Sequence, residues 1–330
     1  MFAANQKYLM DKFSVWYPIP RKLEIRMHEE SVEGIPDNSF IGGGNFPKKI
    51  RSYIRSGNFD AAEKELAAFL SELAEKDSAV TLLSSEALLG TFGFNRRNTD
   101  LLSSVSNKYF KSTEIICVVR PPLDHTVSQY SEFVKRRRLS GSFDDACLDV
   151  FFDLGAYMEP FFASFGQSNV NIIPYMDVRQ GESLVDRFLS AIDSRLTINS
   201  LPIEKYDSNL IVNRSMSVLE CEAAATLNLM RAKFNLNRTV FVKAYTRYMS
   251  KHQKDSLVKF HYLSTKSYVS LLDISNSSFS RLASLCGNSF PFSSPGLVES
   301  MLNASQQRDV ACAAKFNEII SKMLDEILAS

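Results

Sequence analysis

The sequence has few cysteines and no long apolar run, and these absences exclude several classes of protein. Its five cysteines include no C-x-x-C pair, which favours a reducing compartment and ordinary core thiols over a disulfide framework or a zinc site. No apolar run approaches the roughly 20 residues that a membrane helix needs. The first residues, MFAANQKYLMDKF, have neither a long apolar stretch nor a small-residue cleavage site. We therefore expect a cytoplasmic protein without a secretory signal or a membrane span.

The sequence also has no excess of charge of either sign. Thirty-eight lysines and arginines stand against 37 aspartates and glutamates, which gives a net charge of +1. This balance offers no case for bulk nucleic-acid binding, so any anion site must be local. The hydrophobic fraction of 45% allows a sizeable core.

Apolar periodicity predicts an α/β fold. Three β-rich runs, at residues 79–85, 114–120 and 170–175, are separated by helical patterns, and this alternation is typical of a parallel sheet between layers of helices. The predicted helices span residues 3–14, 58–75, 122–139, 143–165, 181–194 and 216–234, with one or two more in 295–328.

Strand signals end near residue 200. We therefore predict an α/β core over residues 1–200 and a mainly helical part, packed on that core, over residues 201–330. The serine-rich segment 273–296 is interpreted as a loop or connector.

One stretch, EIICVVRPPLDHTVSQY, has an unusual order of residues. An apolar run ends at Arg120, and Pro121 and Pro122 follow, which cannot extend a strand but suit a helix start. This order predicts a strand buried on both faces with the Arg120 guanidinium at its carboxyl end, and Ser128 facing the same crevice. Ligands bind at that edge of open α/β sheets, and phosphate is the ligand that an arginine fork fits well.

Both residues also have purely structural interpretations. Arg120 could pair with a neighbouring carboxylate, and Ser128 could donate to the helix carbonyl four residues earlier. The residues by themselves leave both interpretations open.

The segment from Arg120 to Ser128 resembles the R-x-P-x-D-x-x-x-S signature of the sulfotransferase superfamily. The resemblance implies a fold like that of phosphate-loop NTPases, with Arg120 and Ser128 holding the 3′-phosphate of 3′-phosphoadenosine-5′-phosphosulfate (PAPS). Further blocks resembling bacterial sulfotransferases of carbohydrates or small molecules are residues 82–89, 162–178, 183–192 and 213–228. The last of these blocks contains Arg214 and Ser215, which the resemblance places near the donor, although a helix cap explains Ser215 equally well.

In one respect the sequence differs from the sulfotransferase pattern. Sulfotransferases hold the 5′-phosphosulfate with a loop like G-x-x-K-[ST]-G-[ST]-[ST] after the first strand, and this sequence contains no such loop. Its first residues resemble the helix and turn that follow that loop, so we expect the first strand and the loop to be missing, as in an N-terminally truncated protein. The glycine run IGGGNFPKK (41–49) lacks a good preceding strand and is interpreted as a surface turn.

Sulfuryl transfer needs a base that takes the proton of the acceptor hydroxyl. The resemblance makes Glu86, at the end of the first predicted strand, the candidate base, while a capping role beside Ser84 and Ser85 remains an equal alternative. His28 is the second candidate, and His125 is not expected to be catalytic. No spacing of His, Cys or Asp suggests a metal site.

These observations predict a cytoplasmic sulfotransferase that uses PAPS as donor, needs no metal, and acts on a hydroxyl of a carbohydrate or small-molecule acceptor. Without the donor loop we expect the printed chain to be weak or inactive. The alternative is a non-catalytic sulfotransferase-like remnant or binding module. A nucleotide kinase would share the sheet but needs magnesium ligands at strand ends, and the strands here end on Glu86, Arg120 and Tyr175.

Overall fold

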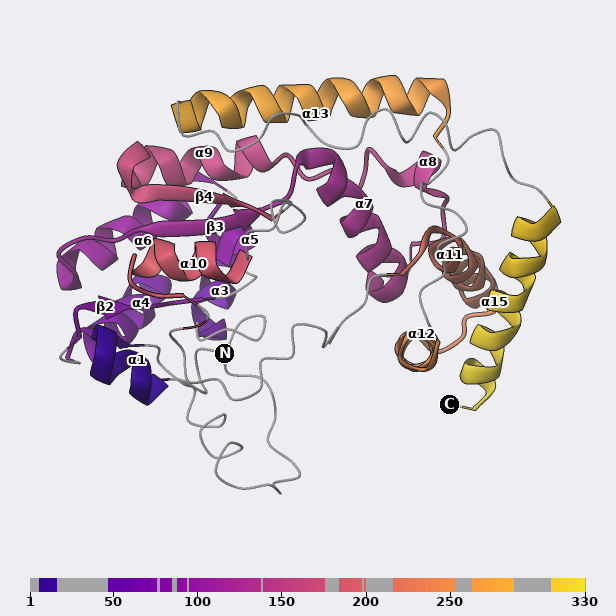
Figure 1. The fold of residues 1–330 in the computed structure, drawn as a ribbon, viewed down its shortest axis with the longest axis horizontal. Coiled ribbons are helices and arrows are strands. Elements are labelled where there is room, and N and C mark those ends of the chain that lie inside the picture. The colour runs from indigo at the N-terminus through magenta and orange to yellow at the C-terminus, as the bar shows by residue number, and fades with distance from the viewer. Residues whose placement is uncertain are drawn as a thin grey trace. The chain divides into compact units, whose positions relative to one another are not determined.

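The computed structural model describes most of the chain and divides it into two compact units (Figure 1). Unit 1 comprises Met1–Val119, Gly155–Tyr206 and Arg281–Pro291, and unit 2 comprises Arg120–Leu154, Asp207–Ser280 and Phe292–Ser330. The predicted boundary at residue 200 stays a prediction. The described residues are 6–16, 47–75, 78–84, 88–93, 95–137, 139–175, 184–197, 199, 216–252, 263–287 and 310–329.

Unit 1 contains two small parallel sheets. In one, β1 (Val15–Trp16) pairs with β2 (Val80–Thr81); in the other, β3 (Ile115–Val119) pairs with β4 (Val170–Pro174) along the whole length of both strands. The helix α10 (Leu184–Ile192) contacts β3 and β4. The α/β class with parallel strands is therefore confirmed, whereas no three-layer sheet is found in the described part of the chain.

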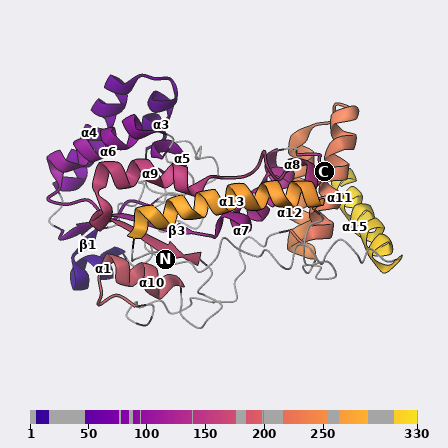
Figure 2. The ribbon, with the colours of Figure 1, turned by 90° about the horizontal axis from the view of Figure 1, so that it is seen from above.

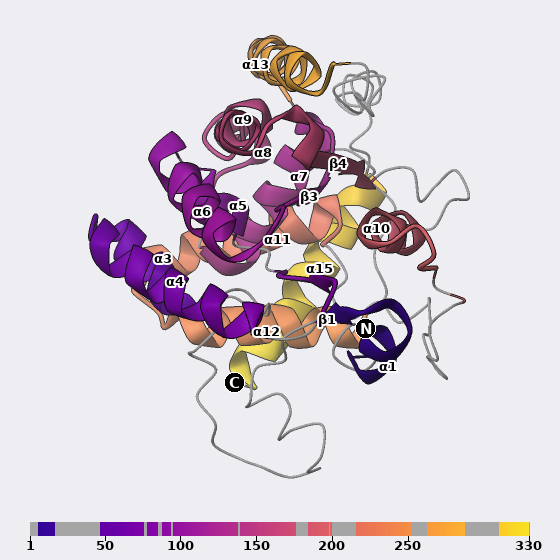
Figure 3. The same ribbon diagram turned by 90° about the vertical axis from the view of Figure 1, so that its left-hand side faces the viewer.

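Four further helices of unit 1 pack on one another, as two views show (Figures 2 and 3). The helix α4 (Phe59–Ala74) contacts both α3 (Lys48–Arg55) and α6 (Arg96–Tyr109), and α5 (Leu88–Phe92) contacts α6. Asn58 caps α4 by accepting a hydrogen bond from the Ala61 N–H, and Asn95 caps α6 in the same way from Asn98. The helices are α1 (Gln6–Phe13), α3 (Lys48–Arg55), α4 (Phe59–Ala74), α5 (Leu88–Phe92), α6 (Arg96–Tyr109), α9 (Leu154–Phe165) and the short η3 (Gln167–Asn169).

Helix α9 is held against α5 and α6 by close contacts. A Cβ atom at Gly93 would lie 2.6 Å from the Tyr157 carbonyl oxygen, so only glycine allows this approach. Ser164 donates to Asp100 Oδ1 at 2.7 Å, and Ser103 donates to the Ser164 carbonyl at 3.0 Å. The helical spacing of five phenylalanines in the sequence predicts core positions. Phe161, Phe162 and Phe165 are buried, whereas Phe151 and Phe152 are half-buried.

Two expectations about the strands are wrong. The first predicted strand, residues 79–85, is shorter in the structure: it ends at Thr81, where it pairs with the two-residue strand β1, and the Leu82 N–H donates to the Trp16 carbonyl at 2.8 Å. The strand β3 is not buried on both faces: Val118 is 39% exposed. In the described part of the chain, β4 is the one strand paired with β3.

Unit 2 is helical and has its own hydrophobic core. The large buried residues of this core include Tyr130, Phe143, Tyr245 and Met323. Helix α15 contacts α11 and α12, and these three lie side by side in Figure 1. The elements of unit 2 are α7 (Pro122–Glu132), the π-helical turn η2 (Phe133–Arg137), α8 (Phe143–Ala146), α11 (Val218–Lys233), α12 (Arg238–Lys251) and α15 (Val310–Leu328).

The π-helical turn is stabilised by a side chain from α11. A π-turn leaves backbone carbonyls without their usual helical partners. The Asn228 Nδ2 atom donates to the Val134 carbonyl at 2.8 Å and to the Leu139 carbonyl at 3.0 Å, and Asn228 Oδ1 accepts from the Tyr245 hydroxyl at 3.2 Å. Asn228 is buried, so one amide satisfies polar groups that water cannot reach.

The C-terminal helix is fixed to α12 by a charged cluster. The buried Glu326 carboxylate accepts a hydrogen bond from Lys251 Nζ at 2.5 Å, and Arg247 Nε lies 3.8 Å from its other oxygen. The hydrogen bond from Lys251 holds the pKa of Glu326 below its ordinary value. The carboxylate is therefore ionised at neutral pH and attracts both cations.

The serine-rich segment was predicted incorrectly. Residues 273–286 belong to the long helix α13 (Thr265–Cys286) rather than to a loop. Its buried positions are Leu271, Ser275, Ser278, Leu282 and Cys286, which follow helical spacing. Because two of these five are serines, the apolar period was not visible in the sequence. No helix among the described residues is long and apolar enough to cross a membrane.

Candidate functional site

The candidate site is the segment that joins β3 to α7 and the first turns of that helix. The strand ends at Val119, Arg120 follows, and α7 begins at Pro122. Pro121 has the extended conformation, and its carbonyl accepts the first helical bond, from the His125 N–H at 2.9 Å. The predicted order of strand, arginine and proline-initiated helix is therefore confirmed at the level of the backbone.

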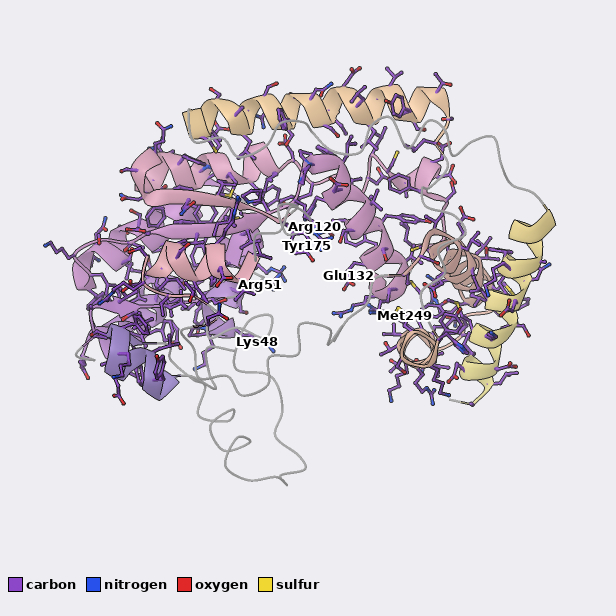
Figure 4. All side chains as sticks on the ribbon, viewed as in Figure 1. Lys48, Arg51, Arg120, Glu132, Tyr175 and Met249 are labelled. Atoms are coloured by element: carbon purple, nitrogen blue, oxygen red, sulfur yellow. The ribbon has the colours of Figure 1, made fainter. Side chains whose placement is uncertain are left out.

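The first turn of α7 carries Asp124 and has no side-chain cap. Free N–H groups and the positive end of the helix dipole favour negative charge at this position. Figure 4 labels Arg120 before this end of α7 and Glu132 at the opposite end. An anion held by Arg120 would lie at the favourable end of the helix dipole.

Ser128 differs from the neighbouring Thr126 in how it uses its hydroxyl. Thr126 is buried and donates to the Pro122 carbonyl at 2.8 Å, which is the back-bond that was considered for Ser128. Ser128 is half-buried, and within the described part of the chain its hydroxyl makes no hydrogen bond. The hydroxyl of Ser128 is thus available to a ligand, and that of Thr126 is not.

His125 is the unexpected residue of this segment. Its ring packs against Phe152, with 5.1 Å between ring centroids, and its Nε2 atom lies 3.4 Å from Gln129 Nε2. Burial, assisted by the positive charge of Arg120, lowers its pKa to about 4. The imidazole is therefore neutral at physiological pH, and its buried Nδ1 atom has no hydrogen-bond partner among the described residues.

The sequence has a run of four basic residues at 135–138, and the described part of this run lies in the turn η2, which follows the C-terminal end of α7. Arg136 is exposed and forms an ion pair with Glu132, with 2.8 Å between Nε and Oε1. Cations at a helix C-terminus are favoured by the helix dipole. The described part of the run therefore has a structural explanation, and it lies at the end of α7 opposite to Arg120.

Four of the predicted site residues lie outside the described residues: Glu86, His28, Arg214 and Ser215. Their roles stay predictions. The sequence predicts Ser215 or Ser217 as the cap of the helix that follows. Ser217 accepts a hydrogen bond from the Glu220 N–H, and the Glu220 carboxylate accepts one from the Ser217 N–H at 2.7 Å. The predicted cap of this helix is therefore confirmed as Ser217.

Sequence reasoning missed the environment of His125. The residue was recognised as helical, but Phe152 lies 27 positions further along the chain, and no local pattern predicts their contact. The one signal available was the position of the histidine between an arginine and an apolar helix face. No three His, Cys, Asp or Glu side chains in the described ranges lie close enough together to hold a metal ion.

Comparisons of this chain with models of protein families, with curated proteins and with solved structures found no match. The function must therefore be inferred from the residues themselves and from the motif that they form.

Proposed function

We propose that this protein is a sulfotransferase-like protein that binds PAPS, with Arg120 and Ser128 on its 3′-phosphate, and transfers the sulfuryl group to a hydroxyl of a carbohydrate or small molecule. The observation that carries the proposal is the R-x-P-x-D-x-x-x-S spacing on a strand-to-helix junction. The finer fold assignment, a sulfotransferase fold related to phosphate-loop NTPases, belongs to the same proposal. The parallel pairing of β3 and β4 supports it.

Phosphate binding requires donors that point to one place. The Arg120 guanidinium offers a planar fork of N–H groups that fits phosphate oxygens, and such charge-assisted bonds are among the strongest in proteins. Ser128 follows eight residues later on α7, with a hydroxyl that the helix does not use. Because His125 is neutral, Arg120 supplies the positive charge of this segment that would attract an anion.

The proposed reaction is an in-line transfer. The acceptor oxygen attacks sulfur and loses its proton to a base, the bond between sulfur and the 5′-phosphate oxygen breaks, and adenosine 3′,5′-bisphosphate leaves. Glu86 is the proposed base, and His28 is the second candidate. With the donor fixed by its 3′-phosphate, positioning would supply a large part of the rate enhancement.

The printed sequence has no loop for the 5′-phosphosulfate. In sulfotransferases this loop stabilises the charge of the leaving phosphate, and loss of such a donor group costs about two to three orders of magnitude in rate. We therefore propose that this chain binds the 3′-phosphate end of the nucleotide and turns over weakly or not at all. The same absence favours the second candidate, a non-catalytic sulfotransferase-like binding module.

Calorimetric titration with adenosine 3′,5′-bisphosphate tests the proposal. We expect binding by the unmodified chain and a decrease in affinity of roughly 10- to 150-fold in Arg120→Ala, the range for hydrogen bonds to a charged group. Arg136→Ala is the matched control, because it removes an exposed arginine at the far end of α7. Equal losses in the two variants, or no binding by a folded sample, would contradict the proposal.

A further inference from the structure

Exposed apolar side chains are concentrated at the junction of α11 and α12. Of the nine large hydrophobic residues that are exposed in the described part of the chain, four lie within eight positions. All residues from Ala232 to Thr239 are exposed as well. The four are Leu229 (58%), Met230 (45%), Phe234 (62%) and Leu236 (47%), and we call them, with the turn that carries them, the α11–α12 tip.

The α11–α12 tip is a well-ordered turn. Leu236 N–H donates to the Arg231 carbonyl at 3.0 Å and Asn235 N–H donates to the Ala232 carbonyl at 3.3 Å, which is the Schellman pattern. Asn235 has the positive φ of 50° that this turn requires. Asn237 then caps α12 by accepting from the Thr239 N–H at 2.9 Å. The backbone therefore holds Phe234 and Leu236 out of the core.

The chain around this tip is strongly basic. Residues 223–252 contain six lysines and arginines and no aspartate or glutamate, although the whole chain has a net charge of +1. Arg247 and Lys251 form ion pairs with Glu326, and Arg231 is buried. The other three, Lys233, Arg238 and Lys243, are exposed.

Lys233 and Arg238 lie on either side of the apolar residues in the turn. The Lys233 ammonium lies 5.8 Å from the centre of the Phe234 ring, and Arg238 donates to the Arg136 carbonyl. Long basic side chains of this kind can place their charge at a polar boundary while their stems stay in an apolar layer.

We propose that the α11–α12 tip docks on the surface of an anionic lipid membrane, with its apolar side chains in the interfacial layer and Lys233 and Arg238 at the lipid headgroups. Apolar residues flanked by cations bind such surfaces through buried apolar area and electrostatic attraction together. A nucleic acid would match the charge but would leave four large apolar side chains in water. This docking is independent of the proposed sulfotransferase function and survives if that function is disproved.

Co-sedimentation with lipid vesicles tests the docking. We expect the chain to bind vesicles of phosphatidylcholine and phosphatidylglycerol in equal parts, and to bind phosphatidylcholine vesicles much more weakly. The double variant Phe234→Ser with Leu236→Ser should lower the partition coefficient at least roughly tenfold. The matched control is Leu148→Ser with Val269→Ser, which removes two exposed apolar residues of the same unit (47% and 48%) and should bind normally.

A second pair of variants separates the charge from the apolar contact. Lys233→Gln with Arg238→Gln should reduce binding to the anionic vesicles roughly 25-fold, since each cation near such a surface contributes about a fivefold factor. Binding to the neutral vesicles should not change. Circular dichroism before and after each substitution checks that the helices remain folded.

Three results would overturn the proposal. The first is the absence of binding to anionic vesicles at low salt. The second is equal loss of binding in the tip variant and in the control variant. The third is a shift from dimer to monomer in sedimentation velocity for the tip variant without any effect on vesicle binding, which would assign the tip to contact with a second copy of this chain.

Discussion

The imidazole ring of His125 packs against the phenyl ring of Phe152, with 5.1 Å between their centroids, one helical turn before Ser128. This contact, together with the charge of Arg120, keeps the histidine neutral. The segment that carries the candidate phosphate-binding residues therefore contains a buried titratable group, and its stability should depend on pH.

Acid should destabilise the folded chain through His125. Its folded pKa of about 4 lies below the ordinary value of 6.5. Between these values the unfolded chain binds the proton and the folded chain does not. The contribution of His125 to the free energy of unfolding is therefore fully present above pH 6.5 and decreases as the pH falls towards 4. We expect a loss of about 2 kcal/mol at pH 5 from this group, measured by urea unfolding.

The variant His125→Leu isolates that contribution. It should lower the dependence of the unfolding free energy on pH between 6.5 and 4, while wild type and variant should share the same flat dependence between pH 7 and 8. An unchanged pH dependence in the variant would show that His125 titrates normally.

Ser128 and Thr126 form a matched pair on the same helix. Ser128→Ala should reduce affinity for adenosine 3′,5′-bisphosphate roughly 10-fold or more, the value of a hydrogen bond to a charged group, without a change in stability. Thr126→Val should leave affinity unchanged and cost up to about 1 kcal/mol in stability, because it removes the buried hydroxyl that donates to the Pro122 carbonyl. The opposite assignment of the two effects would contradict the site.

Asn228 should be a stability determinant of unit 2. Its side chain satisfies the Val134 and Leu139 carbonyls, so Asn228→Leu leaves both without this partner, at a cost of about 2–4 kcal/mol. Urea unfolding measures the loss. Asn276→Leu, an exposed position on α13, is the control and should change stability by less than about 0.5 kcal/mol. Similar midpoints for the two variants would refute the role of Asn228.

The four described cysteines should resist thiol reagents in the folded chain, because Cys147, Cys221 and Cys286 are buried and Cys117 is half-buried. Loss of hydration raises the pKa of Cys117 to about 12 and that of Cys147 to about 11, and the thiolate is the reactive species. In a Cys312→Ser background we expect slow reaction with Ellman's reagent at pH 8 and reaction of all four remaining thiols in urea. Rapid labelling of Cys117 or Cys147 without denaturant would contradict this expectation.

The sequence predicted the parts of the fold that local chemistry determines. The serines just before the helical pattern predicted the start of α11, whose cap is Ser217, and the prolines after Arg120 predicted the start of α7. Each of these signals operates within a few residues. The extent of α4, Phe59–Ala74, matches its predicted range of 58–75 for the same reason.

The missed features depend on contacts between distant residues. The π-turn after α7 is completed by Asn228, about 90 positions away, and the buried serines of α13 make a helix face that looks polar in the sequence. The strand β2 is shorter than the β-rich run that predicts it, and its pairing is with β1, 65 positions earlier in the chain. Likewise, the backbone path from Arg120 into α7 could be predicted, but the contact of His125 with Phe152 could not.

The most direct test of the phosphate site is the selectivity of this chain between adenosine 3′,5′-bisphosphate and adenosine 5′-monophosphate. The two ligands differ in the 3′-phosphate. If Arg120 binds that group, the wild-type chain should prefer the bisphosphate by roughly 10-fold or more, and Arg120→Ala should lose most of this preference while its affinity for the monophosphate stays the same. A preference that persists in Arg120→Ala would contradict the account, because the 3′-phosphate would then be bound elsewhere.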